Sequence, residues 1–374
     1  MVFQFMMSTI MMVVIITNFR QLDYMLKADL GFQKKQVVIV NTPRDVPNPF
    51  ARRETFRNLL LDHPGVENVS YSYGMPGGHI PDSPTIEING KQESVKGILV
   101  DDHYTDVLGI KIIEGRNFSQ DHPGDVLLSS DHGEGGILIS EGMAREFGLD
   151  SPIGKKIHSL GSQRFTLEIV GVFKDIHFRS LREKVEPLFL LRFADPGDGA
   201  NIRIKTENIP SVLKVIQEDW EKIWPQTPFH YEFLDEAFNW QYRNEEQMAD
   251  VIRYFTVLAL IIACMGLFAL SSFLVSRRTK EIGIRKSLGA SVMTIYGMLS
   301  WNFIKWILLA IIIACPVGWY IMNKWLETFA YHIKLTWDIF GLAAIIAITI
   351  ALLTITWQSV RTARANPVEA LRYE

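Results

Sequence analysis

The feature that most limits how this chain can fold is a run of 21 residues without a charged side chain, from Phe255 to Val275. An α-helix rises about 1.5 Å per residue, so this run would form a helix of roughly 31 Å, which matches the hydrocarbon core of a bilayer. The run therefore predicts a membrane span.

Three other segments are candidates for membrane spans. They run from about Trp301 to Met322, from about Phe340 to Trp357, and from Met1 to Phe19. For Met1–Phe19 a cleaved signal peptide is the alternative, but the segment lacks a basic start and a small-residue cleavage site. We therefore expect four transmembrane helices.

Charge is divided unevenly along the chain. Residues 1–253 contain 27 Lys and Arg against 36 Asp and Glu, whereas residues 254–374 contain 11 against 5. The basic residues of the second part gather in the loop at 277–300 and in the tail after Trp357, and short basic loops remain on the cytoplasmic side. Both termini are therefore expected in the cytoplasm, and residues of about 20–250 outside.

The external residues are expected to form an α+β domain with its own core. Cys264 and Cys315 are the two cysteines and fall in predicted spans, so this domain has no disulfide. Helix and strand periodicity predicts one β-α-β unit over about 32–73 and a second over about 194–235. The sequence between them, at about 74–193, is rich in turn signals and predicts a mainly β insertion.

Helices are expected to connect this domain to the spans on both sides. A helix at about 18–30 is expected to continue the first span and to end at Gly31. A second helix, at about 236–253, contains no helix-breaking residue before the second span. This second helix can therefore transmit force from the external domain into the membrane. The full prediction is transmembrane helix 1 at 1–19, the external domain at 20–250, transmembrane helix 2 at 254–276, a cytoplasmic segment at 277–300, transmembrane helix 3 at 301–323, an external loop at 324–338, transmembrane helix 4 at 339–358 and a cytoplasmic tail at 359–374.

The sequence GLDSPIGKK at 148–156 has some likeness to a phosphate-binding P-loop. It has five residues between Gly148 and Gly154 where that motif needs four, and Lys156 stands where Ser or Thr would bind magnesium. We favour a turn that closes a short helix.

Acidic and histidine side chains cluster in one loop of the expected insertion. Their spacing matches neither a zinc site nor an EF-hand, so a solvated loop without metal is the prediction. The residues are Asp121, His122, Asp125, Asp131, His132 and Glu134. The chain also lacks catalytic, cofactor-binding and nucleic-acid-binding motifs, so we expect no enzymatic activity.

Several segments resemble a known family. SRRTKEIGIRKSLGAS at 276–291 and RTARANPVEALRYE at 361–374 resemble the FtsX-like permease domain of MacB-type ABC transporters. Four external segments are similar to the MacB-type periplasmic core domain: GMPGG at 74–78, VLGIKIIEGRNFS at 107–119, ISEGMAREFGLDSPIGKKI at 139–157 and EIVGVFKDIHFRSLREKVEPLFL at 168–190. Ser140 departs from the family, in which Asn is usual at that position.

The resemblance implies a non-catalytic permease subunit driven by a separate ABC ATPase, which binds the ATP. In such a transporter two permease units face each other, and ATP-driven movement passes through helices to the external domain. The contact with the ATPase is implied to be Arg278, Glu281, Gly283, Arg285, Lys286, Gly289 and Ala290. An orientation signal without a partner is the alternative for this segment, and Glu281 is better explained as an ion-pair or docking residue than as a catalytic carboxylate.

The expected location is the bacterial inner membrane, in which the chain contacts lipid. The expected partners are the ATPase, a second permease half or an identical copy, and a periplasmic adaptor or substrate protein, without nucleic acid. Family members often carry two four-span halves, so the chain is expected to be a fragment or a half-size unit. The competing functions are a membrane-anchored sensor or scaffold without an ATPase and, third, a membrane-anchored enzyme.

Overall fold

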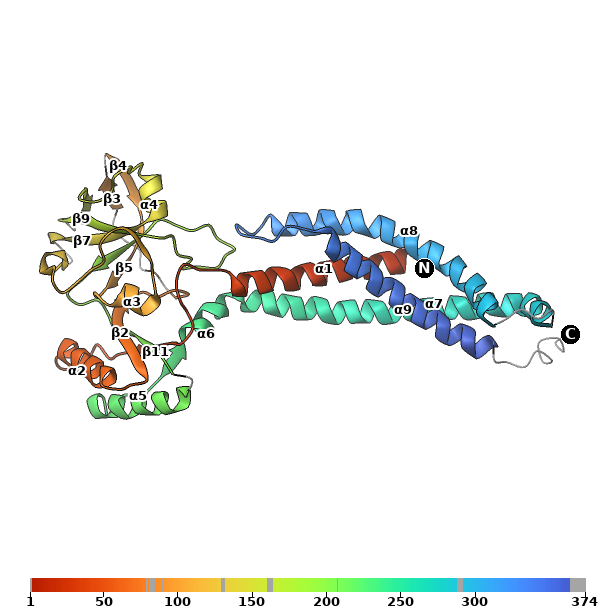
Figure 1. The fold of residues 1–374 in the computed structure, drawn as a ribbon, viewed down its shortest axis with the longest axis horizontal. Helices are drawn as coiled ribbons and strands as arrows, with labels where there is room; N and C mark the ends of the chain where they lie inside the picture. Colours follow the sequence, from red (N-terminus) through yellow and green to blue (C-terminus); the bar gives the residue numbers. More distant parts are fainter. Residues whose placement is uncertain are drawn as a thin grey trace. The chain divides into compact units, whose positions relative to one another are not determined.

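The computed structural model describes residues 2–78, 80, 85–88, 90–128, 132–159, 164–206, 208–287 and 292–363. The chain divides into two compact units, an α+β domain at Ala28–Tyr242 and a helical unit made of Met1–Lys27 and Arg243–Glu374 (Figure 1). The α+β domain is therefore inserted between the first helix and the later helices, which confirms the predicted fold class.

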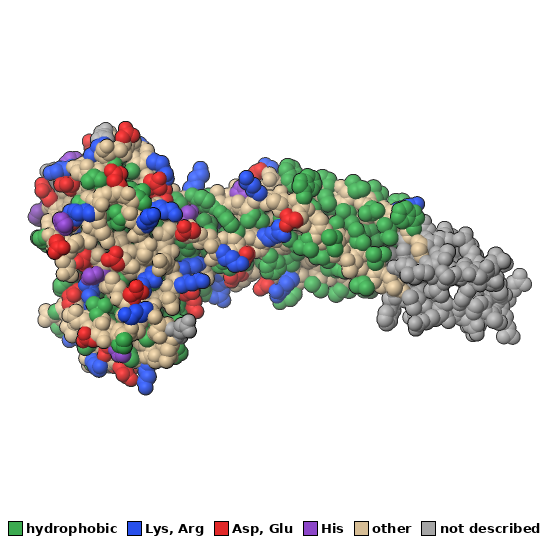
Figure 2. Space-filling model, in the orientation of Figure 1, with side chains coloured by type: hydrophobic (Ala, Val, Ile, Leu, Met, Phe, Trp, Pro, Cys, Tyr) green, Lys and Arg blue, Asp and Glu red, His purple; other side chains and the backbone are tan. Residues whose placement is uncertain are grey.

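The described part of the helical unit consists of long helices. They are α1 (Val2–Lys27), α7 (Arg243–Ser287), α8 (Val292–Leu326) and α9 (Trp337–Ala363). The four predicted apolar helices are confirmed, because each contains a stretch long and apolar enough to cross a membrane. On the face drawn in Figure 2, hydrophobic side chains cover much of the described part of this unit, as contact with lipid requires.

The loop between α8 and α9 is fastened to α1. The buried side chain of Gln21 donates a hydrogen bond to the Tyr331 carbonyl at 3.0 Å and accepts one from the Ile333 amide at 2.9 Å. Arg20 forms an ion pair with Asp338 at 2.5 Å. One turn of α1 thus holds both the loop and the start of α9.

Both predicted β-α-β units are present in the α+β domain. The first is β1 (Val37–Asn41), α2 (Pro49–Leu61) and β2 (Val66–Tyr73), and the second is β11 (Gly199–Ile204), α5 (Ile209–Ile223) and β12 (Tyr231–Phe233). The units interleave in the strand order β12-β1-β11-β2 with antiparallel neighbours, and α2 and α5 lie side by side (Figure 1).

Large apolar side chains hold α2 and α5 together. Val212, Ile216 and Trp220 recur every four residues in α5, as one face of a helix requires, and Trp224 follows at the same interval. All four are buried, and the Phe56 ring of α2 lies 5.2 Å from the Trp224 ring. This apolar stripe fixes the face of α5 that covers the sheet.

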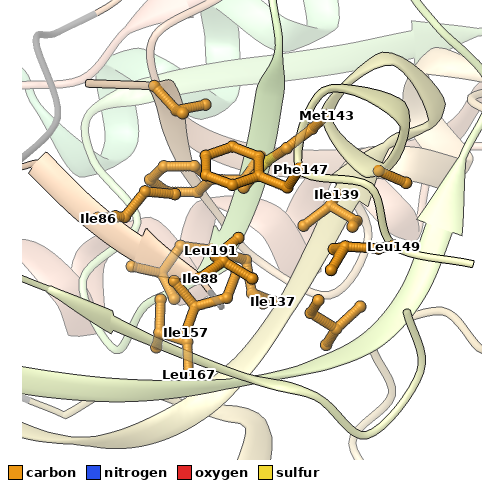
Figure 3. Close-up of a cluster of buried hydrophobic side chains, with 14 of the residues drawn as sticks. Ile86, Ile88, Ile137, Ile139, Met143, Phe147, Leu149, Ile157, Leu167 and Leu191 are labelled. Atoms are coloured by element: carbon orange, nitrogen blue, oxygen red, sulfur yellow. The ribbon is translucent and has the colours of Figure 1, made fainter. Parts of the chain in front are cut away.

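The insertion is mainly β, as predicted. Its strands are β3 (Thr85–Ile88), β4 (Lys91–Ser94), β5 (Lys96–Val100), β6 (Ile112–Gly115), β7 (His132–Ser140), β8 (Lys156–Ser159), β9 (Arg164–Phe173) and β10 (Leu188–Arg192). Short helical segments are α3 (Tyr104–Leu108), η1 (Pro123–Asp125) and α4 (Glu141–Glu146). Figure 3 shows its core, in which Met143 and Phe147 lie near Ile86, Ile139 and Leu191.

One sheet runs through both parts of the domain, which the sequence does not predict. β2 pairs with β5 at Ser72–Val100 and Tyr73–Leu99. The strand order therefore continues as β5-β10-β7-β9-β8-β3-β4, and β6 pairs with β9. Within the sheet, these two residue pairs join the interleaved β-α-β units to the insertion.

The helices that connect the two units differ in detail from the prediction. α1 ends at Lys27, so Gly31 is not the residue that stops it. The helical stretch from Leu234 is divided into α6 (Leu234–Asn239), the 3₁₀ turn η2 (Trp240–Tyr242) and α7. At its other end α7 continues to Ser287, past the predicted end of transmembrane helix 2 at 276, so the segment predicted to be cytoplasmic begins as part of this helix.

Candidate coupling site

Five of the seven predicted coupling residues lie at the C-terminal end of α7, the longest helix among the described residues. Its 45 residues correspond to about 68 Å at 1.5 Å per residue. Arg278, Glu281 and Arg285 follow one another at intervals of three and four residues, which places them on one face of the helix. The backbone thus brings two basic positions and one acidic position together.

The other predicted contact residues are divided between the helix and the sequence after it. Gly283 and Lys286 belong to α7, which ends at Ser287. Gly289 and Ala290 lie outside the described residues, and α8 begins at Val292. The predicted contact therefore includes the last turns of α7.

A second group of residues lies where the chain enters and leaves the α+β domain. We call it the junction cluster: Leu30, Phe32, Phe178, Phe238 and Tyr242, all buried. The Phe32 ring lies 5.7 Å from the Phe238 ring and 6.3 Å from the Phe178 ring, and Phe238 lies 6.1 Å from Tyr242. Residues just after α1 and just before α7 thus share one apolar core.

Hydrogen bonds connect this cluster to two loops of the insertion. The His177 amide donates to the Leu30 carbonyl at 2.8 Å, and the Gly77 amide donates to the Phe178 carbonyl at 2.9 Å. The Tyr242 hydroxyl oxygen accepts a hydrogen bond from the Leu181 amide at 3.2 Å. Both ends of the domain are therefore held by the segment at 177–181.

Two glycines allow this close packing. Gly31 has a φ of +80°, and a Cβ there would lie 2.5 Å from the Asp175 carbonyl oxygen. Gly77 has a φ of +82°, and a Cβ there would lie 2.9 Å from the Phe238 Cα. Other residues disfavour this backbone conformation, and the neighbouring backbone leaves no room for a side chain.

Polar contacts surround the junction cluster. Lys34 donates a hydrogen bond to Asn239 at 2.9 Å and lies 5.1 Å from the centre of the Phe238 ring. Burial lowers the pKa of Lys34, and burial also lowers the pKa of His177 against smaller opposing effects of Leu30 and nearby carboxylates. The site is therefore partly shielded from water.

Sequence reasoning did not find the junction cluster. Gly77 and Phe178 belong to two segments that carry the family resemblance, GMPGG and FKDIHFRS. Those segments are separated by about one hundred residues, and no periodicity indicates that they meet. The positive φ of Gly77 is the structural reason for glycine in the first of them.

Two family models match this chain. The FtsX-like permease C-terminal model matches residues 253–367, and the MacB-like periplasmic core domain model matches residues 6–189. The chain belongs to the FtsX-like permeases that carry a MacB-like periplasmic core domain. The resemblance stated from the sequence is thereby confirmed, and the permease is a multi-pass membrane protein.

Several known proteins are similar to large parts of the permease. YknZ, an uncharacterized ABC transporter permease of Bacillus subtilis (strain 168), is 22% identical in an alignment of 371 residues that covers 94% of this chain and 89% of YknZ. The solved periplasmic region of MacB from Actinobacillus actinomycetemcomitans is 13% identical, with a TM-score of 0.40, and covers 56% of this chain and 94% of that one. The solved extracellular domain of the noncanonic ABC-type transporter YknZ from Gram-positive bacteria is 20% identical, with a TM-score of 0.35. That match covers 52% of this chain and 97% of the solved domain.

The P-loop-like segment of the permease is a turn at the end of α4. Gly148 follows the helix with a φ of +62°, and its amide donates to the Arg145 carbonyl at 3.1 Å. Ser140 caps the start of the same helix, because its hydroxyl accepts hydrogen bonds from the Met143 and Leu188 amides at 3.1 and 3.2 Å. The departure from Asn at this position is thus accommodated by another good capping residue.

The acidic loop of the permease is built around an ion pair. Arg116 donates to both carboxylate oxygens of Asp125, at 2.5 and 2.9 Å. Asp131 lies outside the described residues, and elsewhere in the described chain no three His, Cys, Asp or Glu side chains gather as metal ligands.

Proposed function

We propose that this permease couples ATP hydrolysis by a separate nucleotide-binding subunit to movement of its α+β domain, for export, extraction or transmembrane signalling. The observation that carries the proposal is the continuity of α7, which starts directly after Tyr242 of the junction cluster and continues to Ser287. Hydrogen bonds in every turn resist a change in helix length, so force applied at one end is passed to the other.

The ATPase contact is proposed to be the face formed by Arg278, Glu281 and Arg285, completed by Gly283, Lys286, Gly289 and Ala290. A segment that only fixes orientation needs positive charge and no acidic residue. The presence of the acidic residue Glu281 therefore favours a contact with the ATPase over a segment that only fixes orientation.

The proposed partners are an ABC ATPase and either a second permease half or an identical copy, with lipid around the spans. A periplasmic adaptor or substrate protein is proposed for the α+β domain. We place that domain on the outer face of a bacterial inner membrane and both termini in the cytoplasm. In a variant without Cys264 and Cys315, cysteine at Ser211 should react with an impermeant maleimide in intact cells, and cysteine at Ser291 should not. The reverse labelling would contradict this orientation.

ATPase stimulation tests the proposed coupling. Glu281→Arg and Arg285→Glu should each reduce permease-dependent ATP hydrolysis about tenfold, which corresponds to about 1.4 kcal/mol. The matched control is Lys324→Glu, because Lys324 and Glu327 form an exposed ion pair in the helical unit away from the proposed contact. If no ATPase co-purifies with the permease, or if both variants leave permease-dependent ATP hydrolysis unchanged, the sensor or scaffold function would be favoured.

A further inference from the structure

A single cation stands near one end of the apolar stretch of α8. From Trp301 to Asn323 the chain has one charged residue, Lys305. The stretch of α8 that is apolar enough to cross a membrane begins at Phe303, so Lys305 lies in its first turn. A charged side chain inside hydrocarbon is costly, and a lysine near the end of a span avoids this cost by extending to the membrane surface.

The ammonium group of Lys305 lies at the level of Trp301. Side chains of an α-helix tilt toward its N-terminus, and the Lys305 Nζ atom lies 5.5 Å from the centre of the Trp301 ring, which belongs to the preceding turn. One turn of helix is about 5.4 Å long. The charge therefore lies just before the apolar stretch begins, at the height expected for lipid headgroups.

The two side chains face away from the core of the helical unit. Phe303 and Ile307 are buried in that core. Trp301 and Lys305 precede them by two residues each, which is about 200° around the helix. Trp301, Lys305 and the neighbouring Trp306 are all exposed. Tryptophan is enriched at the headgroup level of membranes, so this face of α8 presents a cation and aromatic rings to lipid.

The charge of Lys305 is not neutralised within the described part of the chain. Among the described residues, its ammonium group contacts the Trp301 ring and no carboxylate. The sequence just before this turn is also basic, because residues 277–300 contain five Lys and Arg against one acidic residue. Clustered basic residues at a membrane surface attract anionic lipids.

We propose that Lys305 and Trp301 bind the headgroup of an anionic phospholipid at this end of α8. The ammonium group donates hydrogen bonds to the phosphate, and the Trp301 ring stabilises the ammonium group through a cation–π contact. A zwitterionic headgroup carries a cation of its own, which the lysine repels, so the anionic headgroup is preferred.

The acyl chains of this lipid have an apolar surface to cover. Leu308 and Ile312 are exposed and follow Lys305 at intervals of three and four residues, so they continue the same face of α8. A soluble phosphate ester lacks this contact, which favours a lipid as the ligand. The site concerns lipid alone and does not depend on ATPase coupling.

Native mass spectrometry of the full chain in detergent tests the site. Phosphatidylglycerol should bind more tightly than phosphatidylcholine with the same acyl chains. Lys305→Gln should reduce this preference about fivefold, and Lys305→Arg should retain it because arginine keeps the charge. Lys305 is exposed, so neither variant should disturb folding. The matched control is Lys324→Gln at the other end of α8, where Lys324 is paired with Glu327, and it should keep the wild-type preference.

Two further measurements identify the contacts. Trp301→Leu removes the cation–π contact and should reduce the preference about twofold, whereas Trp337→Leu, at an exposed position of α9, should not. Glycerophosphoglycerol, which is the headgroup without acyl chains, should not displace the bound lipid at millimolar concentration. Displacement would identify a soluble phosphate ester as the ligand and overturn the lipid site. Equal binding of the two lipids by the wild-type chain, or an unchanged preference in Lys305→Gln, would also overturn the inference.

Discussion

Gly77 lies so close to α6 that a side chain does not fit. Gly77→Ala should lower the free energy of unfolding by about 2–4 kcal/mol, because its positive φ is unfavourable for alanine and the new Cβ would meet the Phe238 backbone. Gly90 is the matched control, since its φ is +78° but no described atom lies within 4 Å of a Cβ there.

Gly90→Ala should therefore cost only the backbone contribution of about 1 kcal/mol. The measurement is the thermal transition of the α+β domain in the purified chain, followed by tryptophan fluorescence. Equal shifts in the two variants would show that the contact with Phe238 does not contribute.

His177 should make the junction cluster sensitive to acid. Burial lowers its pKa below the usual 6.5, so the unfolded chain takes up a proton more readily than the folded chain. This contribution to stability is present above about pH 6.5 and is lost as the pH falls through the lower folded pKa. His177→Gln should reduce the fall in transition temperature on acidification, whereas the exposed control His230→Gln should not. An unchanged pH dependence in His177→Gln would contradict this prediction.

At the scale of elements, an unbroken α7 is the requirement for coupling. Val257 is 51% exposed on this helix, so Val257→Pro removes little packing but breaks a helical hydrogen bond and clashes with the preceding turn. Permease-dependent ATP hydrolysis should fall about tenfold while the ATPase still co-purifies. Val257→Ala is the control and should retain activity. Wild-type stimulation by Val257→Pro would show that helix continuity is unnecessary.

The elements differ in how far the sequence predicts them. Uncharged runs predicted the apolar helices, and the apolar residues Val212, Val215, Ile216, Ile223 and Trp224 predicted α5, because both signals are local. The pairing of β2 with β5 depends on the register of strands distant in sequence, which periodicity does not encode. The continuation of α7 past residue 276 was missed because a change from apolar to basic composition does not itself end a helix.

The candidate site shows the same contrast. The coupling residues stay a prediction, made from one contiguous basic segment with a family resemblance. The junction cluster was missed because Phe32, Phe178 and Phe238 come from three distant segments and are ordinary core aromatics when each is considered alone.

In the whole molecule, we propose, binding of ATP to a partner moves the α+β domain. Acidic residues are in excess up to residue 253, and basic residues are in excess after it. This division is consistent with two parts of the chain that lie in different environments. The proposed movement requires that α7 connect these parts mechanically.

Electron spin resonance distances between the two units test this movement. Spin labels would be placed at Lys214 and Lys324, exposed residues of the α+β domain and the helical unit, in a chain without Cys264 and Cys315. With a hydrolysis-deficient ATPase bound, ATP should shift the distance distribution, and Val257→Pro should abolish the shift. Identical distributions with and without ATP, while the ATPase remains bound, would show that ATP binding does not move the α+β domain.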